Sequence, residues 1–299
     1  MKVVILGPGA VGGLLAAVLW KHGNEVICVA RPGTIKFFET EGLKLESRIF
    51  GNFTARPKFV ANLDAKPDIL FITIKAPALS GALLSVPTSI VADATVVPLM
   101  NGLDHMAVLK EIFSNVTAGS IGIEVFVSDG KIIHSSSDAR INLASNSKEL
   151  AQIFPNIAAT LKQAGFKVSL SATEAQVLWK KFARLAPLAL TTAATGKTLG
   201  YILTDSIWRI KLENCIKEVT QIARAEGLIL EFSEVIKDLQ SLHPDQFSSL
   251  ARDIAAGKPS ELDAIAGALI WRSEKYGLSC PVISELYQLI KKRIKSGGD

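Results

Sequence analysis

The sequence predicts two domains, an α/β domain built on a parallel sheet and an all-α domain after it. In the first half, short runs of β-branched residues alternate with helical patterns, as a parallel sheet with crossover helices requires. Beyond residue 171 the strand-like runs end, and apolar residues recur at helical spacing. The 299 residues also suffice for two domains at roughly 150 residues each. We therefore predict domains over residues 1–171 and 172–299.

Four apolar runs are the expected strands of the parallel sheet: Lys2–Leu6, Glu25–Val29, Ile69–Ile74 and Thr95–Met100. Ala10–His22 is predicted as a helix that ends at Gly23. Residues 43–47 and 53–59 are expected to form a small inserted strand pair, and Asp129-Gly130 indicates a hairpin turn. A helix over 148–164 and a strand over 166–170 complete the first domain.

The second domain is expected to contain a helix whose apolar face is formed by Trp208, Leu212, Ile216, Val219 and Ala223. Thr204 is the predicted N-cap of this helix, and Gly227 is its predicted end.

Composition excludes several classes of protein. The apolar fraction is 48% and the charged fraction 20%, as in globular proteins. The net charge of +5 is spread over scattered Lys and Arg residues, so we expect no nucleic-acid partner. The three cysteines lie far apart, which indicates neither a disulfide framework nor a zinc site. The four histidines show no metal-ligand spacing and are interpreted as surface or hairpin residues, so no metal is expected.

Residues Val3–Trp20 carry no charge, and a signal peptide or membrane span is the alternative interpretation of this segment. It contains four glycines and a proline in its first half and at its centre, which suit a strand, a tight turn and a helix instead. We therefore expect a cytoplasmic protein with no membrane partner.

The segment Gly7-Pro8-Gly9-Ala10-Val11-Gly12 has the spacing GxGxxG between a predicted strand and a predicted helix. In such a turn Gly7 permits the tight bend, Gly9 lets a pyrophosphate approach the backbone, and Gly12 lets the helix pack on the strand. The helix N-terminus then faces the phosphates. This context predicts a Rossmann-type domain whose cofactor-binding residues are Gly7 to Gly12, and the alternative is a structural glycine turn.

Arg31 stands near the end of the second predicted strand, where sites that prefer NAD carry an acidic residue. A guanidinium there can pair with the 2′-phosphate of NADP. NADP(H) is therefore the expected cofactor, and an exposed surface arginine is the alternative.

Several motifs, in order and spacing, resemble those of the ketopantoate reductases (2-dehydropantoate 2-reductases) over nearly the whole chain. Besides the glycine turn and Arg31, they are Ile74-Lys75-Ala76, Asn101-Gly102, Leu178-Trp179-Lys180-Lys181 and Ser260-Glu261-Leu262-Asp263. The resemblance implies reduction of an α-keto acid with NADPH, in a cleft between a Rossmann-type domain and a helical domain like that of 6-phosphogluconate dehydrogenases.

The resemblance implies three catalytic residues. Lys181 corresponds to the lysine that protonates the ketone oxygen as hydride arrives, and its alternative is a solvated lysine beside Lys180. Glu261 corresponds to the glutamate that binds the hydroxyl end of the substrate, whereas an acidic residue in a first helical turn is also favoured by the helix dipole. Asn101 corresponds to a residue near nicotinamide and substrate, and an ordinary Asn-Gly turn is the alternative.

Other assignments carry alternatives of similar weight. Lys75 corresponds to a lysine near cofactor and substrate, or is a loop cation. Ser249 corresponds to a substrate-binding serine, or is a solvent-facing serine, and adjacent Ser248 makes the register uncertain by one position. Arg184 is a further candidate for the carboxylate of the substrate.

The sequence departs from the resemblance on the helix that carries Lys181. Family members have asparagines four and eight residues after the lysine, whereas this chain has Leu185 and Ala189, with Pro187 between them. The resemblance makes ketopantoate the first substrate to test, and the absence of the two asparagines makes a more apolar keto acid an alternative. A hydroxyacid or opine dehydrogenase and a non-catalytic NADP(H)-binding regulatory paralogue are further alternatives, and a homodimer is left open.

Overall fold

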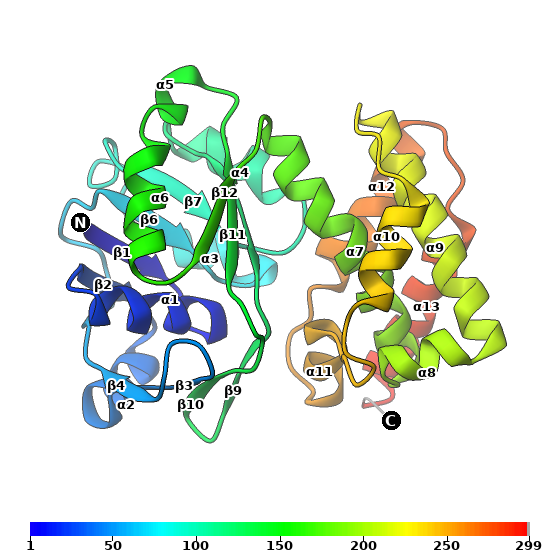
Figure 1. Ribbon diagram of the computed structural model, residues 1–299, viewed down its shortest axis with the longest axis horizontal. Helices are drawn as coiled ribbons and strands as arrows, with labels where there is room; N and C mark the ends of the chain where they lie inside the picture. The colour runs from blue at the N-terminus through cyan, green and yellow to red at the C-terminus, as the bar shows by residue number, and fades with distance from the viewer. Residues whose placement is uncertain (298–299) are drawn as a thin grey trace. The chain divides into compact units, whose positions relative to one another are not determined.

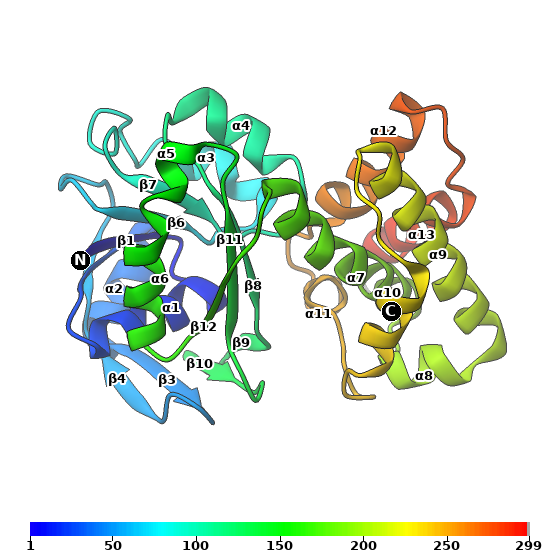
Figure 2. The same cartoon turned by 45° about the horizontal axis from the view of Figure 1, so that its top comes forward.

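The computed structural model describes residues 1–297, which divide into two compact units. The first unit consists of Met1–Met100 and His105–Val177, and the second of Asn101–Asp104 and the chain from Leu178 onward. The first is α/β and the second is helical, so the predicted fold class is confirmed (Figures 1 and 2). None of the described helices is both long and apolar enough to cross a membrane.

The division between the units falls inside helix α7 (Glu174–Thr195), after Val177, rather than at the predicted position 171/172. The first turn of α7 is fixed to the first unit through Glu174. Its carboxylate accepts a hydrogen bond from Lys110 (Nζ–Oε2 2.5 Å) and another from the backbone amide of Asn146 (3.3 Å). The boundary therefore follows these contacts and not the start of the helical pattern.

A five-stranded parallel sheet forms the centre of the first unit, in the order β5-β2-β1-β6-β7. Its strands are β1 (Lys2–Leu6), β2 (Glu25–Val29), β5 (Lys58–Val60), β6 (Ile69–Ile72) and β7 (Thr95–Pro98). The four predicted runs are all in this sheet, and the middle residues of β1 are fully buried. Burial on both faces explains why these runs are continuously apolar and do not alternate.

Helix α1 (Ala10–Lys21) packs between this sheet and a second sheet of order β4-β3-β10-β9. Strands β3 (Leu43–Ser47) and β4 (Phe53–Ala55) form the expected antiparallel pair. The predicted strand over 53–59 was wrong in its second half, because β5 leaves the pair and joins β2 in the main sheet. Pro57 separates β4 from β5, and a proline lacks the N–H that a continuous ladder needs.

The predicted hairpin joins β9 (Val125–Ser128) to β10 (Lys131–His134). Asp129 and Gly130 have φ of 49° and 73°, the positive values of a two-residue hairpin turn. A third sheet has the order β12-β11-β8, with β8 (Ala118–Gly122), β11 (Arg140–Ala144) and β12 (Lys167–Leu170).

The other helices of the first unit are α2 (Pro32–Glu41), the short 3-10 helix η1 (Ala76–Ala78), α3 (Leu79–Leu83), α4 (His105–Ile112), α5 (Lys148–Ala151) and α6 (Phe154–Gln163). The helix predicted over 148–164 is therefore two helices. Pro155 lies at the start of α6, where its missing N–H costs nothing, so the break precedes it. Helices α2 and α4 were not predicted. The interpretation of the histidines as surface or hairpin residues was wrong for His105, which is buried in α4.

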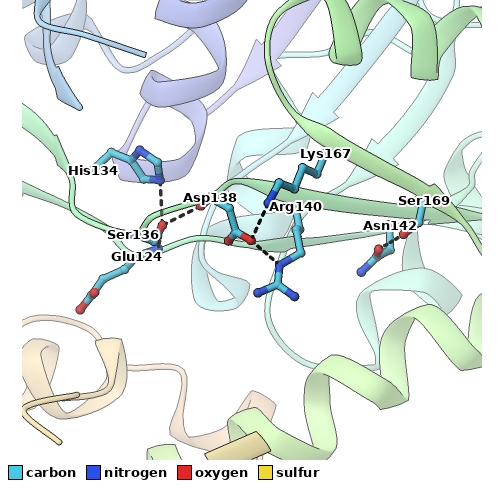
Figure 3. A network of polar contacts seen from close by, with 8 residues as sticks. All are labelled: Glu124, His134, Ser136, Asp138, Arg140, Asn142, Lys167 and Ser169. Carbon is cyan, nitrogen blue, oxygen red and sulfur yellow. Dashed lines mark hydrogen bonds and ion pairs between the residues drawn. The ribbon is translucent and has the colours of Figure 1, made fainter. Parts of the chain in front are cut away.

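Polar contacts fix the chain where it passes from β10 to β11 (Figure 3). His134 lies in β10 of the hairpin, as expected, but its side chain is buried, and burial lowers the pKa of its imidazole. Its Nε2 lies 2.8 Å from the hydroxyl of Ser136, which donates to the backbone oxygen of Asp138. The Asp138 carboxylate pairs with Arg140 and Lys167 at 3.1 and 3.4 Å. These contacts link β10, β11 and β12.

The second unit is helical. After α7 its elements are α8 (Leu199–Thr204), α9 (Ser206–Ala225), α10 (Phe232–Gln240), α11 (Ser249–Ala255), a π-helical turn η2 (Asp263–Gly267), α12 (Ala268–Lys275) and α13 (Pro281–Lys295). Helix α9 is central and contacts α8, α10, α12 and α13. Its buried face includes Leu212, Ile216, Val219 and Ala223, as the periodicity predicts.

The predicted N-cap of α9 was wrong by one residue. Asp205, not Thr204, caps the helix, and its Oδ1 accepts from the amides of Ile207 and Trp208 at 3.0 and 2.9 Å. Thr204 is instead the last residue of α8, and its hydroxyl donates to the carbonyl of Gly200. A carboxylate also complements the positive helix N-terminus.

Candidate active site

The glycine turn between β1 and α1 is bent at Gly7, whose φ is 88°. Its amide donates to the carbonyl of Val29 at 3.0 Å, and a Cβ at this position would clash with the side chain of Ile74. Gly7 therefore meets two requirements that only glycine satisfies without strain, a positive φ and a close neighbour.

Gly9 and Gly12 face different surroundings. A Cβ on Gly12 would clash with the Thr73 hydroxyl and the Gly7 carbonyl, so this glycine permits close packing of α1. A Cβ on Gly9 would meet nothing within 4 Å, and Gly9 is exposed. Open space beside a helix N-terminus is the geometry that admits a pyrophosphate. The residues present therefore fit a dinucleotide.

Arg31 and Lys75 lie at the same edge of the main sheet as the glycine turn. Arg31 follows β2 and is the first residue of the turn into α2, and Lys75 follows β6 and precedes η1. Since β1 is hydrogen-bonded between β2 and β6, the two cations flank the turn on either side. The strand order also reverses between β1 and β6, where open α/β sheets bind ligands.

In the second unit, Lys181 is half-buried on α7. Burial lowers the pKa of its ammonium group to about 8, since a charge is less stable away from water. The negative charge of Glu261 opposes this shift, and the positive charge of Arg184 adds to it. A lysine with this pKa can release a proton near neutral pH.

Glu261 is only 5% exposed and precedes the π-helical turn η2. Its Oε2 accepts a hydrogen bond from the side-chain amide of Asn101 at 2.9 Å. The next residue along the chain, Gly102, has φ of 93°. A Cβ added at this glycine would lie 3.0 Å from the carbonyl oxygen of Ala264 in η2, so a larger residue would be too close. The structure therefore groups Asn101 with Glu261, and both residues belong to the same unit as Lys181. Sequence periodicity did not predict the π turn, although such turns often occur at functional sites.

The two candidate serines have different surroundings. Ser248 is buried, caps α11 by accepting from the amide of Ala251 at 3.1 Å, and accepts from the hydroxyl of Thr192 at 2.7 Å. Ser249 is exposed as the first residue of α11. Ser248 is thus a structural link to α7, while the surface position of Ser249 leaves its hydroxyl accessible.

Helix α7 continues past Pro187 to Thr195, so Leu185 and Ala189 share the helical face of Lys181. Leu185 is half-buried and Ala189 is 1% exposed. The face that carries the lysine is therefore apolar along these two turns.

Asp104 and Arg272, which no sequence motif indicated, form an ion pair in the second unit (Nη1–Oδ1 2.7 Å). They lie far apart in the sequence, and no local spacing connects them. In the part of the chain that the structure describes, no three His, Cys, Asp or Glu side chains are grouped as a metal site would need.

Family models match both units of the chain. "Ketopantoate reductase PanE/ApbA" matches residues 3–148, and "Ketopantoate reductase PanE/ApbA C terminal" matches residues 175–294. The chain belongs to the ketopantoate reductase family. The resemblance on which the sequence-based roles depend is thereby confirmed at the level of the family.

Individual members of the ketopantoate reductase family are distant relatives. The chain is 26% identical over 294 residues to "Uncharacterized oxidoreductase YkpB" of Bacillus subtilis, covering 96% of this chain and 97% of that protein. It is 24% identical over 303 residues to a 2-dehydropantoate 2-reductase of Pyrococcus horikoshii, covering 100% and 99%.

Solved structures agree with this fold. The PanE/ApbA family ketopantoate reductase from Ralstonia eutropha superposes with a TM-score of 0.90 at 25% identity, over 100% of both chains. A D-mandelate dehydrogenase in ternary complex with NADH and anilino(oxo)acetate superposes with a TM-score of 0.92 at 20% identity, also over 100% of both chains. The fold is therefore common to proteins with different substrates.

Proposed function

We propose that this protein is a nicotinamide-dependent oxidoreductase that reduces an α-keto acid to a 2-hydroxy acid. Membership of the ketopantoate reductase family supports this class of reaction. The observation that carries the proposal is Lys181, whose pKa burial lowers to about 8 although the nearby charge of Glu261 opposes this shift. Strongly perturbed titratable groups mark active sites more often than structural positions.

We propose NADPH as the cofactor, bound by the turn Gly7 to Gly12 with Arg31 beside its 2′-phosphate and Lys75 on the other side of the turn. The bound nicotinamide supplies a hydride to the carbonyl carbon of the substrate. NADPH is favoured over NADH because the exposed guanidinium of Arg31 follows β2 where a carboxylate would otherwise bind the ribose.

Lys181 is the proposed general acid. Negative charge develops on the ketone oxygen during reduction, and a protonated lysine both stabilises that charge and delivers the proton. The Glu261 carboxylate is oriented by the Asn101 amide at 2.9 Å, so one of its oxygens has a fixed hydrogen-bond donor. In this proposal Glu261 accepts a hydrogen bond from the substrate hydroxyl, Asn101 contacts the reacting end, and Arg184 or Ser249 binds the carboxylate.

Ketopantoate is the first substrate that we propose, because the relatives at full coverage include 2-dehydropantoate 2-reductases. A keto acid with a more apolar side chain is the second candidate. The apolar face formed by Leu185 and Ala189 favours it, since two amides that the resemblance leads us to expect are missing there.

The test is NADPH oxidation, followed by absorbance, with ketopantoate, phenylglyoxylate and aliphatic 2-keto acids. Lys181→Met should lower kcat by about 100-fold to 10,000-fold at unchanged NADPH affinity. Lys180→Met is the matched control, because Lys180 is the exposed neighbour on the same helix. Turnover at the wild-type rate by Lys181→Met, or equal losses in both variants, would refute the role of Lys181.

Leu185→Asn separates the two substrate candidates. If the site takes ketopantoate, an amide on this face should increase its turnover several-fold, because each added hydrogen bond contributes about 1 kcal/mol. If the natural substrate is apolar, the same change should lower its kcat/KM and leave ketopantoate unchanged. Loss of folding, measured by thermal denaturation, would place Leu185 in the helical core instead.

A further inference from the structure

Arg272 of α12 is a buried arginine held by two carboxylates. Its side chain is 9% exposed. Nη1 pairs with Oδ1 of Asp104 at 2.7 Å, and Nε donates to Oε1 of Glu226 at 2.9 Å. Nη1 also donates to the carbonyl of Ala268 at 3.1 Å. A guanidinium in this position directs donors to several partners at once in a fixed planar geometry.

The contact through Glu226 leads to the helix that carries Lys181. The second carboxylate oxygen of Glu226 accepts a hydrogen bond from Nε1 of Trp179 at 3.0 Å. Trp179 is 2% exposed and lies on α7 in the turn that also contains Lys181. Its ring contacts that of Phe182 edge-on, with centroids 5.8 Å apart. The orientation of this turn is therefore fixed by a buried indole and its carboxylate partner.

The contact through Asp104 leads to Asn101. Residues 101–104 form one short segment of the second unit, which begins with the Asn101 amide on Glu261 and ends with the Asp104 carboxylate on Arg272. Gly102 lies against the carbonyl of Ala264 between these two contacts. The segment is therefore fixed at both ends.

We propose that Arg272 is a positioning residue for the reaction. Through Asp104 it holds residues 101–104 so that the Asn101 amide orients the Glu261 carboxylate, and through Glu226 and Trp179 it orients the turn of α7 that carries Lys181. This inference rests on the proposed function. Arg272 acts through its contacts with Asp104 and Glu226.

The test uses Asp104→Ala, because the Asp104 side chain is 57% exposed and its removal leaves the buried Arg272–Glu226 pair in place. A displaced amide should lower kcat by about 10-fold to 100-fold. The KM for NADPH should be unchanged, and Asp104→Asn, which keeps an acceptor oxygen, should restore part of kcat. Glu213→Ala is the matched control, since it removes the Arg209–Glu213 ion pair (3.0 Å) on the exposed face of α9.

A double-mutant cycle distinguishes positioning from general destabilisation. In the Asn101→Ala background, Asp104→Ala should lower kcat by less than about twofold, because residues that act through one another are not additive. Equal losses in both backgrounds, or no loss in the wild-type background, would overturn the inference.

The rate at which the wild type reduces keto acids is measured separately, and it tests the proposed function. If the wild type reduces no keto acid, hydrogen exchange of the free protein still tests the positioning. Asp104→Ala should then increase exchange of the amides in residues 101–104 relative to Glu213→Ala. Unchanged exchange there would overturn the inference.

Discussion

Lys181 can act as a proton donor only while its ammonium group is protonated, so the pH dependence of turnover tests its role directly. Burial lowers the pKa of this group from 10.5 to about 8. If Lys181 is the general acid, kcat should be constant below this pKa and fall above it. For a pKa of about 8, the protonated fraction falls about tenfold between pH 7 and pH 9. A lysine with its ordinary pKa would lose almost nothing over this range.

Two substitutions should shift the pH at which kcat begins to fall, which we call the pH limit, in opposite directions. Arg184→Gln removes a positive charge that lowers the pKa of Lys181, so the decline in kcat should begin at higher pH. Glu261→Gln removes the negative charge that raises this pKa, so the decline should begin at lower pH. Each profile is compared with the maximum of its own variant, because both changes are also expected to lower the absolute rate.

The assay is kcat at saturating NADPH and keto acid from pH 6 to pH 10, with Lys180→Gln as the control that leaves the pH limit in place. A pH limit that stays near pH 8 in both charge variants would show that another group titrates. A wild-type kcat that stays nearly constant up to about pH 9.5 would show that burial does not perturb the pKa of Lys181 during turnover.

Four further predictions concern cofactor binding and stability. Arg31→Ala should weaken NADPH binding roughly tenfold in calorimetry and leave NADH unchanged, and equal losses for both cofactors would contradict a 2′-phosphate contact. Gly12→Ala should destabilise the fold by about 1–3 kcal/mol in urea denaturation, because its Cβ would clash with Thr73 and Gly7. Gly9→Ala, with nothing within 4 Å of its Cβ, should keep that stability but lose NADPH affinity. Lys181→Met should raise Tm at pH 7 by about 2–4 °C. Burial lowers the pKa of Lys181 in the folded state, so its charge destabilises the fold at pH 7, and methionine removes that charge. An unchanged Tm would show that burying the ammonium group does not destabilise the fold.

Features that depend on residues close together in the chain could be predicted from the sequence. The glycine turn requires a positive φ at Gly7, and the hairpin requires positive φ at Asp129 and Gly130, which are demands that a few residues express locally. The same holds for strand β1, whose apolar run is continuous because both faces are buried. The motif around Lys181 also identified the helix that carries the proposed acid.

Features that depend on residues far apart in the chain could not be predicted from the sequence. No local pattern predicts that β5 pairs with β2 and not with β4. The same is true of Asn101, which belongs to the helical unit, and of the ion pair between Asp104 and Arg272. The same is true of the pKa of Lys181, which is set by burial and by Glu261. Such contacts form only when separate elements pack, because desolvation and charge pairing act through space and not along the sequence.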